Sequence, residues 1–253
     1  MRRSIFAAMG AAFAMLALAA TPVRAQSLDD LAKANVELKA ALSAGGAPPR
    51  LADPAGGRMI RAAFDERVLP AMAGQDLAAT LQVCSGPIEN LFGYMRWGVA
   101  ANAPEAQVEA AMRANTDRYQ DEIAVALGFT IGCGARMMPA IERFAANIRP
   151  GEWTTQQREG LNQIRNGALS IYQGAVTVPE DGSRQENQLL VVGRAADLAD
   201  IYAAALTLEQ RHAVVAAADR EMASPKASPA VKAKIALIRR VMSRTDCTGL
   251  CAL

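Results

Sequence analysis

The stretch "LAATLQVCSGPI", residues 77–88, contains no charged side chain, in a chain where 21% of the residues are charged. Its leucines, alanines and valine recur at helical spacing, so we predict a helix that begins near Asp76 and is buried on most of its sides. Pro87 has no amide hydrogen, and we expect the helix to bend or restart there. Because a helix without a polar face must be covered by other elements, this stretch indicates a central helix of the fold.

The rest of the chain predicts the same kind of element. It is rich in alanine, only 5% of its residues are aromatic, and its apolar residues recur at helical spacing. We therefore predict an all-α fold, a bundle-like domain of about seven or eight helices over residues 26–253. At this length we expect either one unit or two packed halves, residues 26–147 and 148–253.

Proline and glycine divide the first half of this domain. A first helix is expected to stop at "GGAPPRLADPAGG", residues 45–57, which has the composition of a loop. A short helix over residues 59–72 follows. Another is expected from Glu105 onward, until the glycines of residues 128–134 permit a turn or a close helix crossing. A separate helix is then predicted for residues 137–147.

Capping residues mark several helix starts. A hydroxyl at the N-cap accepts a hydrogen bond from the backbone three residues on, where a Glu or Gln side chain can return the bond. Three such pairs occur in the second half of the chain, and proline at a first helical position predicts a fourth start. The pairs are Thr154 with Gln157, Ser183 with Glu186 and Thr207 with Gln210; Ser228 precedes Pro229, and Ser27 can cap the first helix.

Residues 1–25 have the pattern of a secretory signal peptide. Arg2 and Arg3 precede an unbroken apolar run, which ends in the tripeptide "VRA". We expect cleavage between Ala25 and Gln26, and hence a periplasmic or secreted protein. The arginine pair also fits a twin-arginine signal, so the sequence leaves the export route open.

The charge balance excludes one large class of function. Three of the 27 basic residues and none of the 25 acidic residues lie in the predicted signal peptide, which leaves 24 basic against 25 acidic side chains. A nucleic-acid-binding surface needs a strong basic excess, so we expect no nucleic-acid partner. No second apolar run approaches the ~18 residues of a membrane span, so we expect no transmembrane segment in the mature chain.

The four cysteines form an even set, as expected in an oxidising compartment. Three pairings are open to them, and four free thiols are the alternative that export disfavours. We favour Cys84 with Cys133, because each lies in a charge-poor segment that we expect to be buried. Cys247 would then pair with Cys251, where Gly249 relaxes the backbone between them. A redox-active tail is disfavoured, because this spacing is not Cys-x-x-Cys.

His212 is the only histidine, and this count removes many mechanisms. A Ser-His-Asp triad has no Gly-x-Ser-x-Gly turn to present its nucleophile, and metalloprotease, haem-attachment and P-loop motifs are absent. In "LTLEQRH", residues 206–212, Glu209 and His212 form half of a di-metal site, which only a two-fold dimer could complete. The same stretch is a capping box, the interpretation that we favour. We assign no catalytic, cofactor-binding or metal-binding residue and expect no cofactor.

Two segments resemble known periplasmic families. "WTTQQR", residues 153–158, and "LTLEQR", residues 206–211, resemble the paired Leu-Thr-x-x-Gln segments of the small periplasmic chaperones Spy and CpxP. "IYAAALTLEQRHAVVAA", residues 201–217, followed by "ASPKAS", is similar to a periplasmic helical domain family of unknown function, whose Phe-Tyr before Ser-Pro is missing here. The chain is longer than the chaperones and lacks their basic excess, so no site residue is carried over.

These observations favour a non-enzymatic binding or interaction module for an envelope protein or peptide. The alternative is an envelope enzyme that uses a lone glutamate in a groove, and a third hypothesis is the dimer-built metal site. A deep polar pocket around one glutamate would favour the enzyme, whereas an exposed apolar concavity would favour binding. The sequence leaves open whether the chain forms a homo-oligomer.

We predict that the exported protein begins at Gln26 and is released by osmotic shock. Intact-mass measurement of the released protein checks this, because cleavage removes the whole of residues 1–25. A retained leader would contradict both the expected localisation and the argument that the cysteines meet an oxidising compartment.

Overall fold

The computed structural model describes residues 27–149, 151–179 and 182–252, and they form the all-α fold that we predicted. The predicted signal peptide, residues 1–25, lies outside the described residues. Ten α-helices and two 3-10 helices occur within the described ranges, more than the seven or eight expected, and these ranges contain no β-strand. The helices are α1 (Leu28–Ser43), α2 (Pro54–Ala63), η1 (Glu66–Met72), α3 (Leu77–Met95), α4 (Glu105–Arg118), α5 (Gln120–Ala146), α6 (Thr155–Thr177), α7 (Gln185–Asp197), α8 (Ala199–Ala205), α9 (Leu208–Ala223), α10 (Pro229–Met242) and η2 (Gly249–Ala252).

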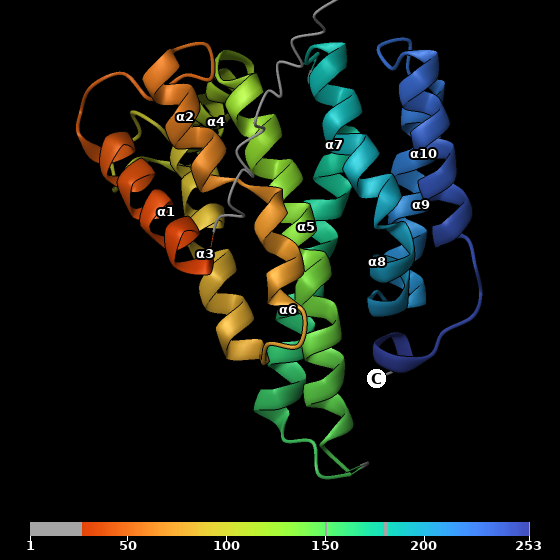
Figure 1. Ribbon diagram of the computed structural model, residues 1–253. Coiled ribbons are helices and arrows are strands. Elements are labelled where there is room, and N and C mark those ends of the chain that lie inside the picture. Colours follow the sequence, from red (N-terminus) through yellow and green to blue (C-terminus); the bar gives the residue numbers. More distant parts are fainter. Residues whose placement is uncertain (1–26, 150, 180–181, 253) are drawn as a thin grey trace, which may run out of the picture.

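Helix α5 lies at the centre of the molecule (Figure 1). On one side it packs against α3, which also packs against α1 and α4. On the other side it packs against α7, and α10 and α9 lie beyond; α6 contacts α5, α7 and α9. The buried apolar residues form one cluster from Leu31 in α1 to Leu250 in η2. A single core therefore extends across the boundary, between residues 147 and 148, of the two halves that the sequence suggested.

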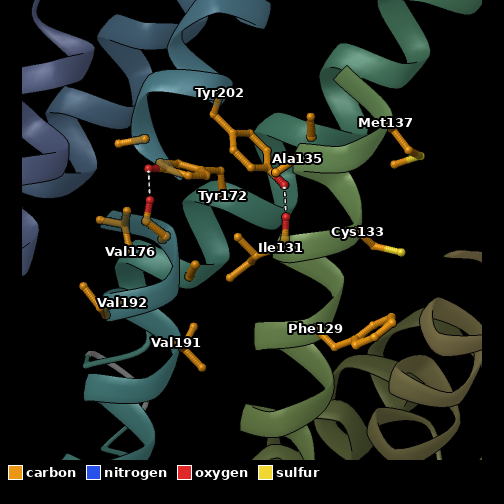
Figure 2. Packing of buried hydrophobic residues seen from close by; sticks show 14 of the residues in the cluster. Phe129, Ile131, Cys133, Ala135, Met137, Tyr172, Val176, Val191, Val192 and Tyr202 are labelled. Carbon is orange, nitrogen blue, oxygen red and sulfur yellow. Dashed lines mark hydrogen bonds between the residues drawn. The ribbon is translucent and has the colours of Figure 1, made fainter. Parts of the chain in front are cut away.

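A glycine allows a second helix to approach α5 closely. The sequence left open whether residues 128–134 form a turn or a close crossing, and α5 is helical through all of them. A Cβ on Gly134 would overlap with the hydroxyl of Tyr202 in α8. That hydroxyl donates a hydrogen bond to the Ile131 carbonyl, 2.9 Å away, and its ring packs on Tyr172 (Figure 2). Residues 128–134 therefore form a close helix crossing and not a turn.

Two expectations about this region were wrong. The helix expected from Glu105 onward is divided into α4 and α5, because the backbone leaves helical geometry at Tyr119, with φ of −112° and ψ of 29°. There the buried tyrosine ring packs against Tyr94 and Trp97. The helix expected at residues 137–147 is not separate, since residues 137–146 are the end of α5.

Helix α5 also has the length and hydropathy of a membrane span, which contradicts our expectation that no second apolar run comes close. Its most apolar 18-residue window has a mean hydropathy of 1.4, and 78% of that window is buried inside the fold. The core helix of a bundle has the same composition, since a helix that is covered on all sides needs no polar face. The packing around α5 accounts for its hydropathy.

The proline- and glycine-rich loop is shorter than expected. Helix α2 begins at Pro54, whose fixed φ suits the first helical position, so the last four residues assigned to the loop are helical. Gly56 and Gly57 lie directly against the preceding loop, because a Cβ on either would come within 2.6 Å of the carbonyl oxygen of Arg50 or Leu51. Glycine is therefore needed here for close packing rather than for a turn.

Two expectations about α3 were wrong. The helix continues through Pro87 rather than restarting there. Residues 77–88 are also not buried on most sides, since Ala78, Leu81, Gln82 and Ser85 are exposed.

The expected side-chain caps are confirmed with one exception, Ser183. Arg184, not Ser183, occupies the N-cap of α7, because the Ser183 hydroxyl donates to the Val178 carbonyl of the preceding turn, 2.9 Å away. Side-chain caps are present at Ser27, Thr154, Thr207 and Ser228.

Two disulfides are present, in the pairing that we favoured. Cys84 in α3 is bonded to Cys133 in α5, with the two Cα atoms 5.8 Å apart, and both residues are buried. Cys247 is bonded to Cys251, with their Cα atoms 5.2 Å apart, and Gly249 between them has a φ of +61°. The first disulfide joins two core helices, whereas the second closes a short loop after α10.

Removing the first disulfide is expected to lower the free energy of unfolding by about 4 kcal/mol, because it joins residues 49 positions apart. Removing the second, which joins residues four positions apart, is expected to cost about 2 kcal/mol or less. Urea unfolding of the C84A/C133A and C247A/C251A double variants measures both losses. Equal losses would contradict the assignment of the first disulfide as the main covalent constraint.

Candidate functional site

An apolar groove lies where the ends of three helices meet. The beginning of α3, the end of α5 and the first half of α6 surround a hollow of about 270 Å³, near the lower ends of these helices in Figure 1. We call this hollow the α3–α5–α6 groove, and no charged side chain lines it. Its lining residues are Leu77, Ile141, Phe144, Trp153, Gln156, Gln157, Gly160, Leu161 and Ile164.

Local contacts fix the helix ends that form the groove. Asp76 caps α3 by accepting a hydrogen bond from the Ala79 amide, 2.8 Å away. Arg143, near the end of α5, donates to the Gln75 carbonyl at 2.6 Å and so ties the segment before α3 to α5. Thr154 starts α6 with a reciprocal capping box. Except for Trp153, which precedes α6, the residues that line the groove belong to regular helices, which hold their positions better than loops do.

Large apolar side chains stay exposed at this groove. Phe144 is 45% exposed, and Leu81, one turn beyond Leu77 on α3, is 41% exposed. Trp153 and Ile164 are half-buried. Full burial of such a side chain is worth roughly 1.5–3 kcal/mol, so leaving Phe144 and Leu81 in water forgoes stability. A concentration of this kind is typical of an interaction surface.

The apolar surface continues along α6 beyond the groove. Glycines recur there every seven residues with isoleucines between them, so small and large residues alternate along one side of the helix. A Cβ added to any of these glycines would meet no other described atom within 4 Å. Residues 166–178 also contain no charged side chain. This α6 stripe consists of Gly160, Ile164, Gly167, Ile171 and Gly174.

The stretch "LTLEQRH" forms the start of α9. The Gln210 amide donates to Thr207 Oγ1 at 3.3 Å, and Gln210 Oε1 accepts from the Thr207 amide at 3.1 Å, which is the predicted capping box. Glu209 and His212 are both exposed. Among the described residues, no group of three or more His, Cys, Asp or Glu side chains is placed to hold a metal ion. A metal site shared between two copies stays a hypothesis.

Glu122 is a buried carboxylate that our sequence analysis missed. It is 1% exposed; its Oε1 accepts a hydrogen bond from the Leu51 amide at 2.7 Å and lies 3.5 Å from Arg50 Nε. The hydroxyl of Tyr94 donates to the Pro49 carbonyl at 2.9 Å, and burial, followed by the negative charge of Glu122, raises the pKa of this tyrosine. These contacts hold the loop before α2 onto α5. Glu122 does not line the groove, so its contacts indicate a structural role.

Two buried arginines were also missed. Arg165 in α6 donates to the Leu250 carbonyl, and Arg211 in α9 donates to the Asp246 carbonyl at 2.6 Å, so both hold the segment after α10. Burial lowers the pKa of Arg165. Helical spacing could have identified this residue, because it lies four positions after Leu161 on the same buried face of α6.

Comparison with known proteins gave no match: no family model matches the chain, and neither a curated protein nor a solved structure is significantly similar to it. The assignment of function therefore depends on the residues and contacts of this chain. Among these, the uncharged groove and the exposed glycines of the α6 stripe are the features that leave apolar or open surface beside the core.

Changing Thr207→Ala is expected to lower the free energy of unfolding by about 1 kcal/mol, because the Gln210 amide loses its acceptor. His212→Ala is the matched control, since this side chain is exposed on the same helix, and its effect should stay below about 0.5 kcal/mol. Urea unfolding measures both changes. Elemental analysis should find no stoichiometric iron, zinc or manganese; bound metal that disappears in the His212→Ala variant would overturn the capping interpretation.

Proposed function

We propose that this protein is a non-enzymatic helical module that binds an apolar segment of an envelope protein or peptide in the α3–α5–α6 groove. The observation that carries the proposal is the groove itself, a hollow of about 270 Å³ with no charged lining residue and with Phe144 exposed at its edge. Binding sites for apolar groups are concave, largely preformed and lined by apolar and aromatic side chains. The groove has each of these properties.

The α6 stripe supports a helical partner. Glycines seven residues apart leave shallow depressions between the isoleucines, into which side chains of a second helix can pack. The absence of charges over residues 166–178 matches the depletion of charged residues at the centre of protein interfaces. We therefore propose that the bound segment is an amphipathic helix whose apolar side faces the groove and the stripe.

We propose that this activity takes place in the periplasm or outside the cell, because residues 1–25 have the pattern of a signal peptide. Two disulfides are compatible with an oxidising compartment. The partner would accordingly be a protein or peptide of the cell envelope.

The alternative, an enzyme that uses a lone glutamate, has less support. A catalytic acid or base has to reach a substrate in a cavity. Glu122 is buried against the loop that precedes α2, and no acidic residue lines the groove. Acidic residues that line other hollows, such as Glu109 and Glu89, face open and mixed surfaces and form ion pairs with Arg113 and Lys39.

Trp153 can report on occupancy of the groove, because the chain has only two tryptophans and Trp97→Phe leaves Trp153 alone. The probe is a synthetic amphipathic helical peptide with leucine at every third or fourth position. We expect its addition to shift Trp153 emission to shorter wavelength and to saturate. In the same background, Phe144→Glu should weaken binding by at least about tenfold, since a carboxylate would have to be buried at the interface.

Val36→Glu is the matched control, because Val36 is 69% exposed on α1 and does not line the groove. It should leave the affinity for the peptide unchanged. Equal loss in both variants, or an emission that does not respond to the peptide, would contradict the proposal. A photoreactive residue at Gln156, compared with one at Val36, would then identify the natural partner in an envelope extract.

A further inference from the structure

The C-terminal tail, residues 243–252, is held against the bundle by buried cations. It follows α10 and ends in η2, on the side of the molecule that α8 and α9 form (Figure 1). Arg165 is 5% exposed and donates to the carbonyls of Ala205 and Leu250. Arg211 is 1% exposed. Within the part of the chain that the structure describes, neither guanidinium forms an ion pair with a carboxylate, and the groups that accept their hydrogen bonds there are neutral.

One of these neutral groups is a disulfide sulfur. Arg211 Nη2 donates to the Asp246 carbonyl at 2.6 Å and lies 3.3 Å from Cys251 Sγ. The two sulfurs of the tail disulfide differ in their surroundings, because Cys251 is 6% exposed whereas Cys247 is partly open to solvent. The Arg211 Nε atom has no partner among the described residues. The guanidinium therefore has unused capacity to bind a negative charge.

We propose that the Cys247–Cys251 disulfide is a thiol-exchange site, in which an external thiol attacks Cys247 and Arg211 stabilises the departing sulfur of Cys251. The direction of attack follows from exposure, because Cys247 is the half-buried residue of the pair whereas Cys251 is buried. Cys251 is the sulfur that leaves, because it lies beside Arg211: a thiolate beside a guanidinium is stabilised and is a better leaving group.

The exchange replaces the bond between the two tail cysteines with a bond between Cys247 and the external thiol. The thiolate of a small-molecule or protein thiol forms a bond to Cys247 Sγ, and the bond between Cys247 and Cys251 breaks. The electron pair of that bond stays on Cys251 Sγ, which becomes a thiolate 3.3 Å from Arg211 Nη2. The product is a mixed disulfide on Cys247. A second equivalent of the same thiol can displace Cys247 as a thiolate and leave as the oxidised dimer of the reagent.

The Cys84–Cys133 disulfide serves as an internal control for the exchange reaction. Cys84 and Cys133 are 1% and 0% exposed, so an external thiol does not reach them while the protein is folded. We therefore expect exchange at the tail disulfide alone.

We expected a redox-inactive tail, because the spacing of Cys247 and Cys251 is not Cys-x-x-Cys, and the contact with Arg211 revises that expectation. In a Cys-x-x-Cys motif, local geometry and a nearby helix N-terminus favour the thiolate. Here Arg211, which lies 35 positions before Asp246 in the sequence, takes that role through the fold. The spacing of the two cysteines carries no information about this residue.

The test starts with the oxidised mature protein and reduced glutathione as the probe. The reaction is quenched with acid after short times, and peptide mass spectrometry locates the glutathione adduct. We expect the adduct on Cys247, with the Cys84–Cys133 disulfide intact throughout. An adduct mainly on Cys251, equal amounts on both, or no adduct on the tail before global unfolding would overturn the proposal. This experiment uses the natural sequence, so its outcome does not depend on whether a variant folds.

The role of Arg211 is tested by Arg211→Met and Arg211→Lys. We expect Arg211→Met to slow formation of the Cys247 adduct by about tenfold, and Arg211→Lys to restore part of the rate because it keeps the charge. The thiolate absorbance of the reduced tail should also appear at higher pH in Arg211→Met than in the natural chain.

Arg165→Met is the matched control. It removes a contact between the tail and the bundle but no contact with a sulfur. Loosening of the tail should expose the disulfide and speed exchange, the opposite of the effect expected for Arg211→Met. Faster exchange in both variants, or the same thiolate titration with and without Arg211, would show that Arg211 only docks the tail, and would overturn its proposed role.

Discussion

Tyr202 reaches the backbone of α5 because Gly134 has no side chain. The tyrosine is fully buried, its ring lies 4.6 Å from that of Tyr172, and its hydroxyl donates to the Ile131 carbonyl. The Tyr172 hydroxyl donates in turn to the Ala195 carbonyl. Two rings thus connect α5, α6, α7 and α8 (Figure 2). Burial raises the pKa of both tyrosines, so their hydroxyls remain donors.

The opposite side of α5 is held by the Cys84–Cys133 disulfide and by Glu122, which binds the loop before α2. With its middle fixed from both sides, α5 can extend its C-terminal end beside α3 and α6. The groove forms at this end, where fewer helices surround α5. A binding surface on regular helices is preorganised, so little conformational entropy is lost there when a partner binds.

The groove and the tail show where the fold gives up stability. Phe144 leaves apolar surface in water, and exposed glycines within α6 disfavour the helix relative to alanine. Arg165 and Arg211 carry buried charges whose hydrogen-bond acceptors, among the described residues, are carbonyls and a sulfur. Burying a charge without a counter-charge is unfavourable. Neither feature is needed to build a helical core, which is why both are candidates for function rather than for folding.

The sequence by itself determined the elements whose cause is local. The helical class follows from composition and spacing, and the starts at Thr154 and Thr207 follow from side chains that bond to their own first turn. The cysteine pairing could also be inferred, because burial of Cys84 and Cys133 was visible in the charge-free segments around them. In each case the partners lie within one helical turn, or their environment is recorded in the neighbouring residues.

Only the tertiary structure decided the features that depend on contacts between distant residues. The sequence could not tell a turn from a close crossing at residues 128–134, because the side chain that needs the space, Tyr202, lies far along the chain. It could not show the groove, since Leu77, Phe144 and Ile164 come from three separate helices. Nor could it place Arg211 beside Cys251. Spacing within a helix records which side is buried, but it does not record which distant atom occupies the space beside it.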